Sequence, residues 1–108
     1  MTVGDVSGEF NAASATVETM TVGDVSGEFY AASATVETMT VGDVSGEFNA
    51  DNATVHSMTL NVTQNIETGN ANDAQFGAIY VPASLLNDFK TTSIFASDYA
   101  DIIYPISA

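Results

Sequence analysis

The chain has no cysteine, no tryptophan and almost no positive charge. Among its 108 residues Lys90 is the single Lys or Arg, against 14 acidic residues. Without Cys there are no disulfides, thiolate metal ligands or Cys nucleophiles, and any redox compartment remains open. The net charge of −13 makes nucleic acid an unexpected partner, because phosphate binding depends on Lys and Arg.

Long apolar runs are also missing. No run is long enough to span a bilayer, so we expect no membrane insertion. No charged segment followed by an apolar one marks a signal peptide at the N-terminus. The chain is therefore expected to work where it is made, to leave by another route, to be a mature fragment, or to belong to a phage particle.

A 19-residue sequence unit occurs three times in tandem over residues 1–57. The first two copies differ only at Asn11 and Tyr30, and the third departs from the first at four positions. A short fixed period is typical of stacked supersecondary units that contact mainly their neighbours. We predict a β-rich solenoid with a parallel sheet, built of leucine-rich-repeat-like or β-helix-like coils.

Each repeat carries a Thr- and Val-rich segment that ends at Gly, which is typical of a strand. Val17, Met20 and Val22 follow the L-x-x-L-x-L spacing of leucine-rich repeats. Alternation places Met20 and Val22 on one face and Thr19 and Thr21 on the other. Stacking then predicts two exposed ladders, Thr19–Thr38–Ser57 and Thr2–Thr21–Thr40–Thr59.

The rest of each repeat is a return path rich in Gly, Asp and Ser, which favours tight turns. We expect Phe10, Phe29 and Phe48 to stack inside the coils. The segment 9–13 is expected to form one helical or 3₁₀ turn. A 19-residue period is at or just below the short limit for leucine-rich repeats, so a plain β-helix coil stays an alternative.

Identical repeats also stack identical charges. Such columns are destabilising unless they are solvated, and Ca²⁺ would relieve them because it binds carboxylate oxygens. The phrase Gly-Asp-Val-Ser-Gly-Glu is not a known calcium loop, so we favour a solvated surface and expect no cofactor. The lone His56 replaces a Glu and indicates a surface substitution. The weak calcium candidates are Asp5, Asp24 and Asp43 in one column, and Glu9, Glu28 and Glu47 in another.

The chain is predicted to divide into repeats (1–60), a loop (61–76), and a last strand with a C-terminal cap (77–108). The strand ends at Pro82, and Ala83-Ser84 supplies the N-cap of a helix. A second apolar set then seals the open coil, as the end of a solenoid requires. Its members are Ile94, Phe95, Tyr99, Ile102 and Ile103.

The run 79–90, IYVPASLLNDFK, and YADI at 99–102 resemble the C-terminal signature of BspA-like leucine-rich-repeat proteins. Phe89 stands where that family usually has Tyr, and its usual Trp is absent. Val22-Gly23 and the segment 28–31 form a shortened version of the family's repeat phrase. These proteins occur on bacterial surfaces and are encoded by phages. The resemblance implies a binding or structural scaffold in a virion or at a cell surface, without catalytic residues.

The first residues begin directly in the strand of the first coil, which leaves a parallel edge open to pairing. We expect the first coil to be covered by another copy, another structural protein or a preceding domain. Met1, Thr2, Val3 and Tyr30 are the residues expected at this interface, and a homo-oligomer is the expected assembly. The leading hypothesis is a non-enzymatic assembly module. The alternative is an adhesin-like module that recognises a protein or glycan through the exposed sheet face. No nucleophile–base pair, phosphate loop or metal cluster indicates an enzyme.

Overall fold

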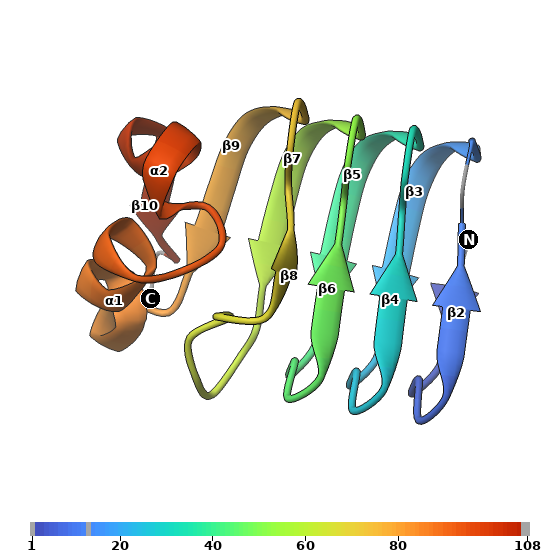
Figure 1. Ribbon diagram of the computed structural model, residues 1–108, viewed down its shortest axis with the longest axis horizontal. Coiled ribbons are helices and arrows are strands. Elements are labelled where there is room, and N and C mark those ends of the chain that lie inside the picture. The colour runs from blue at the N-terminus through green and yellow to red at the C-terminus, as the bar shows by residue number, and fades with distance from the viewer. Residues whose placement is uncertain (1, 13, 107–108) are drawn as a thin grey trace.

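The computed structural model describes residues 2–12 and 14–106, and it is a β-solenoid whose coils form two parallel sheets (Figure 1). The prediction of a β-rich solenoid is confirmed. The six-stranded sheet has the order β1 (Thr2–Val3), β3 (Thr16–Val22), β5 (Thr35–Val41), β7 (Thr54–Leu60), β9 (Gln75–Val81) and β10 (Ile103–Pro105). The four-stranded sheet has the order β2 (Glu9–Asn11), β4 (Glu28–Tyr30), β6 (Glu47–Asn49) and β8 (Gly69–Asn70).

The long strands place identical residues of successive coils side by side. In β3, Met20 and Val22 are buried while Thr19 and Thr21 are exposed, as the alternation predicts. The pairing runs from Val17 directly to Thr19 and omits Glu18, so the strand turns a corner there. This corner explains the spacing of three between Val17 and Met20. Both predicted Thr ladders are in register across the sheet.

The return path forms a second sheet, so the helical turn predicted over residues 9–13 is wrong for the described residues 9–12. Glu9 and Asn11 are exposed and Phe10 points inward, which is the period of a strand. The predicted phenylalanine stack is present, with ring centroids 5.5 Å apart for Phe10–Phe29 and 5.2 Å for Phe29–Phe48. Ala13 lies outside the described residues.

Two glycines allow the turns of successive coils to approach closely. A Cβ on Gly27 would lie 2.0 Å from the carbonyl oxygen of Gly8, and one on Gly46 would lie 2.0 Å from that of Gly27. No side chain fits at such a distance. The glycines of the return path therefore permit the close spacing between coils.

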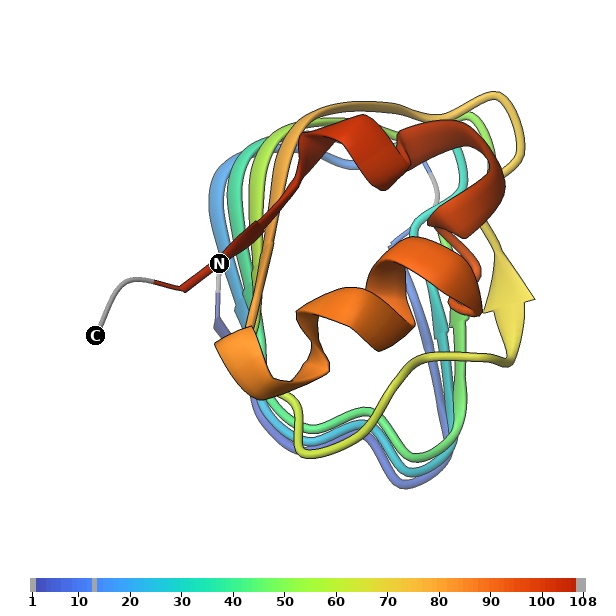
Figure 2. The same cartoon turned by 90° about the vertical axis from the view of Figure 1, so that its left-hand side faces the viewer.

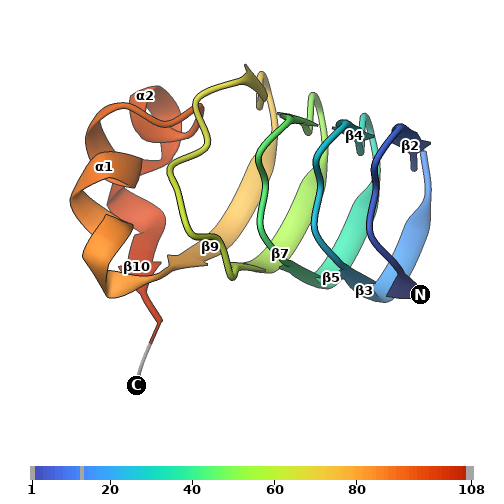
Figure 3. The same ribbon diagram turned by 90° about the horizontal axis from the view of Figure 1, so that it is seen from below.

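A helical cap lies across the C-terminal end of the coil (Figure 2). It consists of the 3₁₀ helices η1 (Ala83–Leu85) and η2 (Ala100–Ile102), with α1 (Leu86–Thr91) and α2 (Ala96–Tyr99). Phe89 and Phe95 are fully buried, and the ring of Phe95 contacts those of Phe48 and Phe76 at centroid distances of 6.3 and 5.6 Å. Seen from below, the row of coils ends against this cap (Figure 3).

Three details of the C-terminal region differ from expectation. Ser84 lies inside η1, and Pro82 occupies its N-cap without a side-chain hydrogen bond, so the predicted Ala83-Ser84 cap is wrong. The sheet continues past β9 to β10, whose Pro105 is tolerated because β10 is an edge strand. The segment 61–76, expected as a loop, contains β8 and begins β9, and its Val62 and Ile66 are buried.

No helix in the described ranges is both long and apolar enough to cross a membrane.

Candidate assembly and binding surfaces

The aspartate column holds neighbouring coils together. Asp5 Oδ1 accepts the backbone N–H of Asp24 at 3.0 Å, and Asp24 Oδ1 accepts that of Asp43 at the same distance. Asp43 ends the column by accepting the backbone N–H of Thr63 at 3.1 Å and its hydroxyl at 2.8 Å. Each carboxylate therefore satisfies an N–H of the next turn, which accounts for the repetition of Asp at this position without a metal ion.

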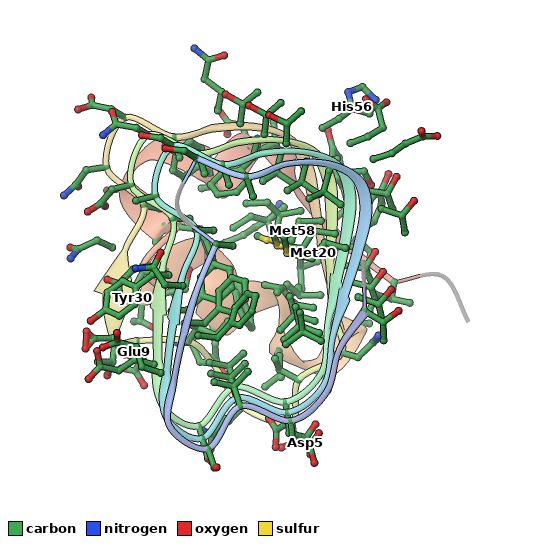
Figure 4. All side chains as sticks on the ribbon, turned by 90° about the vertical axis from the view of Figure 1, so that its right-hand side faces the viewer. Asp5, Glu9, Met20, Tyr30, His56 and Met58 are labelled. Carbon is green, nitrogen blue, oxygen red and sulfur yellow. The ribbon has the colours of Figure 1, made fainter. Side chains whose placement is uncertain are left out.

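The glutamate column lies on the outside of the four-stranded sheet. Glu9 pairs with Glu28 and Glu28 with Glu47 in register, and Tyr30 stands two residues beyond Glu28 on the same face. Figure 4 shows Glu9 and Tyr30 on the outside of one wall, with Met20 and Met58 inside the coil. These carboxylates form a continuous acidic stripe along the sheet.

Polar side chains beside this stripe donate to it. The Tyr30 hydroxyl donates a hydrogen bond to Glu28, and the Asn49 amide donates to Glu47 at 3.4 Å. The hydrogen bond to Glu28, reinforced by burial and by the three glutamate charges, raises the pKa of Tyr30 to about 12. Tyr30 and Asn49 occupy the variable position of the repeat, and both form hydrogen bonds with glutamates of the acidic stripe.

The structure does not bring the two columns together. Asp5, Glu9 and His56 lie on different sides of the coil in Figure 4. Among the side chains that the structure describes, no three of His, Cys, Asp or Glu form a group suited to a metal ion. His56 is exposed and borders a shallow groove with Glu37 and Gln75.

The strands of the first coil form an edge. Among the described residues, β1 pairs only with β3 and β2 only with β4. In later coils, Glu28 and Glu47 donate their N–H groups back to Gly8 and Gly27 at 2.8 and 2.9 Å. The equivalent N–H of Glu9 therefore points away from the other described coils, at the edge of β2.

Apolar groups at this edge are only partly covered. Phe10 and Val17 are half-buried, whereas their equivalents one coil further, Phe29 and Val36, are buried. Of the residues expected at an interface, Thr2 is exposed and Val3 is half-buried at this edge. Tyr30 lies on the adjacent outer face in the second coil, and Met1 lies outside the described residues.

Sequence reasoning missed two aromatic residues that extend the second Thr ladder. Thr59 pairs with Tyr80, and Tyr80 pairs with Tyr104 in β10. Tyr80 follows Ile79 as Thr59 follows Met58, so the alternation already indicated that its side chain points outward. Tyr104 could not be placed in this way, because β10 lies outside the repeats.

Comparisons with protein-family models, with curated proteins and with solved structures find no match to this chain. The resemblance to BspA-like leucine-rich-repeat proteins therefore stays a prediction, and functional inference depends on the surfaces described above.

Proposed function

We propose that this chain is a non-enzymatic assembly module that self-associates through the edge of its first coil. The single observation that carries this is the contrast between the ends of the solenoid. Among the described residues, the C-terminal end is covered by helices, whereas the first coil has the Glu9 N–H and half-buried Phe10 at its edge. Such edges pair readily with another chain. A phage particle or bacterial surface, the setting implied by the resemblance, is part of the proposal.

Two copies can meet in one favourable way. A two-fold axis makes the first coils face each other, and the edge strands then run antiparallel. If Phe10 lies at this axis, Glu9 of each copy faces Asn11 of the other. The stacked glutamates are thereby avoided at the junction, and an amide faces a carboxylate as Asn49 faces Glu47 within the chain. The cap prevents further growth by covering the other end, so the assembly closes as a dimer.

Light scattering of the 108-residue chain tests this proposal. The expected molar mass is twice 11.2 kDa. Glu9→Pro removes the edge-facing N–H and should give a monomer, while the control Glu9→Ala removes only the side chain and should stay dimeric. A monomeric wild type at micromolar to millimolar concentration would contradict the proposal. A change of mass on adding calcium would instead assign a role to the carboxylate columns.

A second candidate function is a binding module that recognises a protein or glycan through the exposed face of the six-stranded sheet. The specific observation in its favour is the in-register column of Thr and Tyr side chains on that face. This function requires no uncovered edge, so a stable monomer would leave it standing.

A further inference from the structure

One column of hydroxyl-bearing side chains crosses the entire six-stranded sheet. The pairing registers place its members on successive strands from β1 to β10. At the usual strand separation of about 4.8 Å the column is about 24 Å long. We call it the Thr–Tyr column, and its members are Thr2, Thr21, Thr40, Thr59, Tyr80 and Tyr104.

The aromatic end of the column offers an accessible ring surface. Tyr104 is 43% exposed and is the one large hydrophobic side chain exposed in the described part of the chain. Its ring centroid lies 5.8 Å from that of Tyr80, with the rings inclined by 37°. On the same face of β9, the residue two before Tyr80 is the small Ala78, which leaves space beside the ring.

The Thr end supplies hydrogen-bonding groups. Thr40 and Thr59 are half-exposed, and their hydroxyls form no hydrogen bond with another side chain or carbonyl among the described residues. A hydroxyl both donates and accepts, so it matches a ligand that also carries hydroxyls. The parallel column of Thr19, Thr38 and Ser57 broadens this hydroxyl-bearing surface.

The chemistry of this face favours a glycan over the other macromolecules. A protein interface normally has an apolar centre, and a single exposed Tyr is too small for one. The net charge of −13 repels anionic polymers. A neutral sugar chain combines apolar ring faces, which stack on Tyr, with hydroxyls, which pair with Thr. The distance between successive sugar units of such a polymer is comparable with the separation of neighbouring strands in the sheet.

We propose that the Thr–Tyr column binds a neutral linear polysaccharide that lies across the strands. Its sugar rings stack on Tyr104 and Tyr80, and its hydroxyls exchange hydrogen bonds with Thr59 and Thr40. This proposal rests on the second candidate function and is independent of self-association at the first coil, because the aromatic pair lies at the opposite end of the sheet.

Affinity electrophoresis in native gels tests the proposal, since the acidic chain migrates readily. The gels contain hydroxyethylcellulose, xyloglucan or a linear mannan, with alginate as an anionic comparison. We expect retardation in at least one neutral gel and none in alginate. Tyr104→Ala should weaken binding about tenfold or more, as loss of a Tyr anchor typically does.

Three variants complete the experiment. Tyr104→Phe keeps the ring and should retain most of the affinity. Tyr30→Asn removes an aromatic residue from the other sheet, restores the residue of the neighbouring repeats, and should bind as the wild type does. Urea unfolding and light scattering check that Tyr104→Ala retains the fold and the mass of the wild type.

Two results would overturn the proposal. The absence of retardation in every neutral gel is one. Retardation that Tyr104→Ala leaves unchanged is the other, and it would keep the binding function but move it to another face. In the first case, Tyr104-dependent capture of a protein would identify a protein as the ligand of this face. None of these results bears on the dimer, which light scattering tests separately.

Discussion

The two ends of the solenoid solve the same problem differently. At each end the interior of the last coil, with its phenylalanine stack, would meet water unless something covered it. At the C-terminal end the helices bring Phe89 and Phe95 onto the stack, and both are fully buried. At the first coil Phe10 ends the stack half-buried. The difference shows that stacking covers only one side of a terminal coil, so the terminal coils depend on something that is not a repeat.

Truncation of the aromatic stack at its two ends should produce the largest difference. Phe95→Ala removes a fully buried ring that contacts three others and should lower the free energy of unfolding by about 3–5 kcal/mol. In the monomer at low protein concentration, Phe10→Ala should cost less, because its side chain is only partly buried. Urea unfolding followed by circular dichroism measures both. Equal costs at high protein concentration would indicate that another copy covers Phe10.

Alanine at one repeat position in two coils gives a sharper test. Gly27→Ala places a Cβ against the Gly8 carbonyl and should destabilise the fold by about 1–3 kcal/mol or more. Gly8→Ala meets nothing within 4 Å and should be neutral or slightly stabilising. Thermal unfolding of the two variants is the measurement. A cost for Gly8→Ala that grows with protein concentration would place another chain against the first coil.

The aspartate column should respond more weakly. Asp24→Ala removes the acceptor of the Asp43 N–H and should cost about 1 kcal/mol, since this hydrogen bond is exposed. Asp24→Asn keeps a carbonyl acceptor while removing one of the stacked charges, so its cost should be near zero. Urea unfolding distinguishes them. If both variants lost equal stability, the negative charge rather than the hydrogen bond would be the stabilising feature.

The smallest effect concerns Tyr30. Its phenol should ionise near pH 12, because the hydrogen bond to Glu28 and the neighbouring carboxylates favour the neutral form. The interactions that raise this pKa stabilise the fold fully below pH 10, the ordinary tyrosine value. Their contribution disappears as the pH rises toward 12 and the phenol ionises. Ultraviolet titration of the wild type against Tyr30→Phe isolates this group. A difference spectrum centred near pH 10 would show that the hydrogen bond to Glu28 is absent in solution.

Predictability from sequence differed between the repeats and the cap. Identical residues such as Met20 and Met39 stack only when the strand register equals the repeat period. The pairing of the long strands could therefore be predicted from the sequence. The short strands did not, because Gly and Asp around Glu9–Asn11 suggested turns, and only stacking against the next coil makes these three residues a strand. The outward position of Tyr80 could also have been predicted, because buried and exposed residues alternate along a strand.

The amino-acid sequence by itself determined the solenoid, the inward and outward faces of its long strands, and the phenylalanine stack, because these follow from a period repeated three times. The tertiary structure decided the rest. The second sheet, the aspartate ladder and the addition of β10 depend on backbone groups of different coils meeting. Tyr104 joins the Thr–Tyr column only because the cap returns the chain to the sheet, a long-range contact that no local pattern encodes.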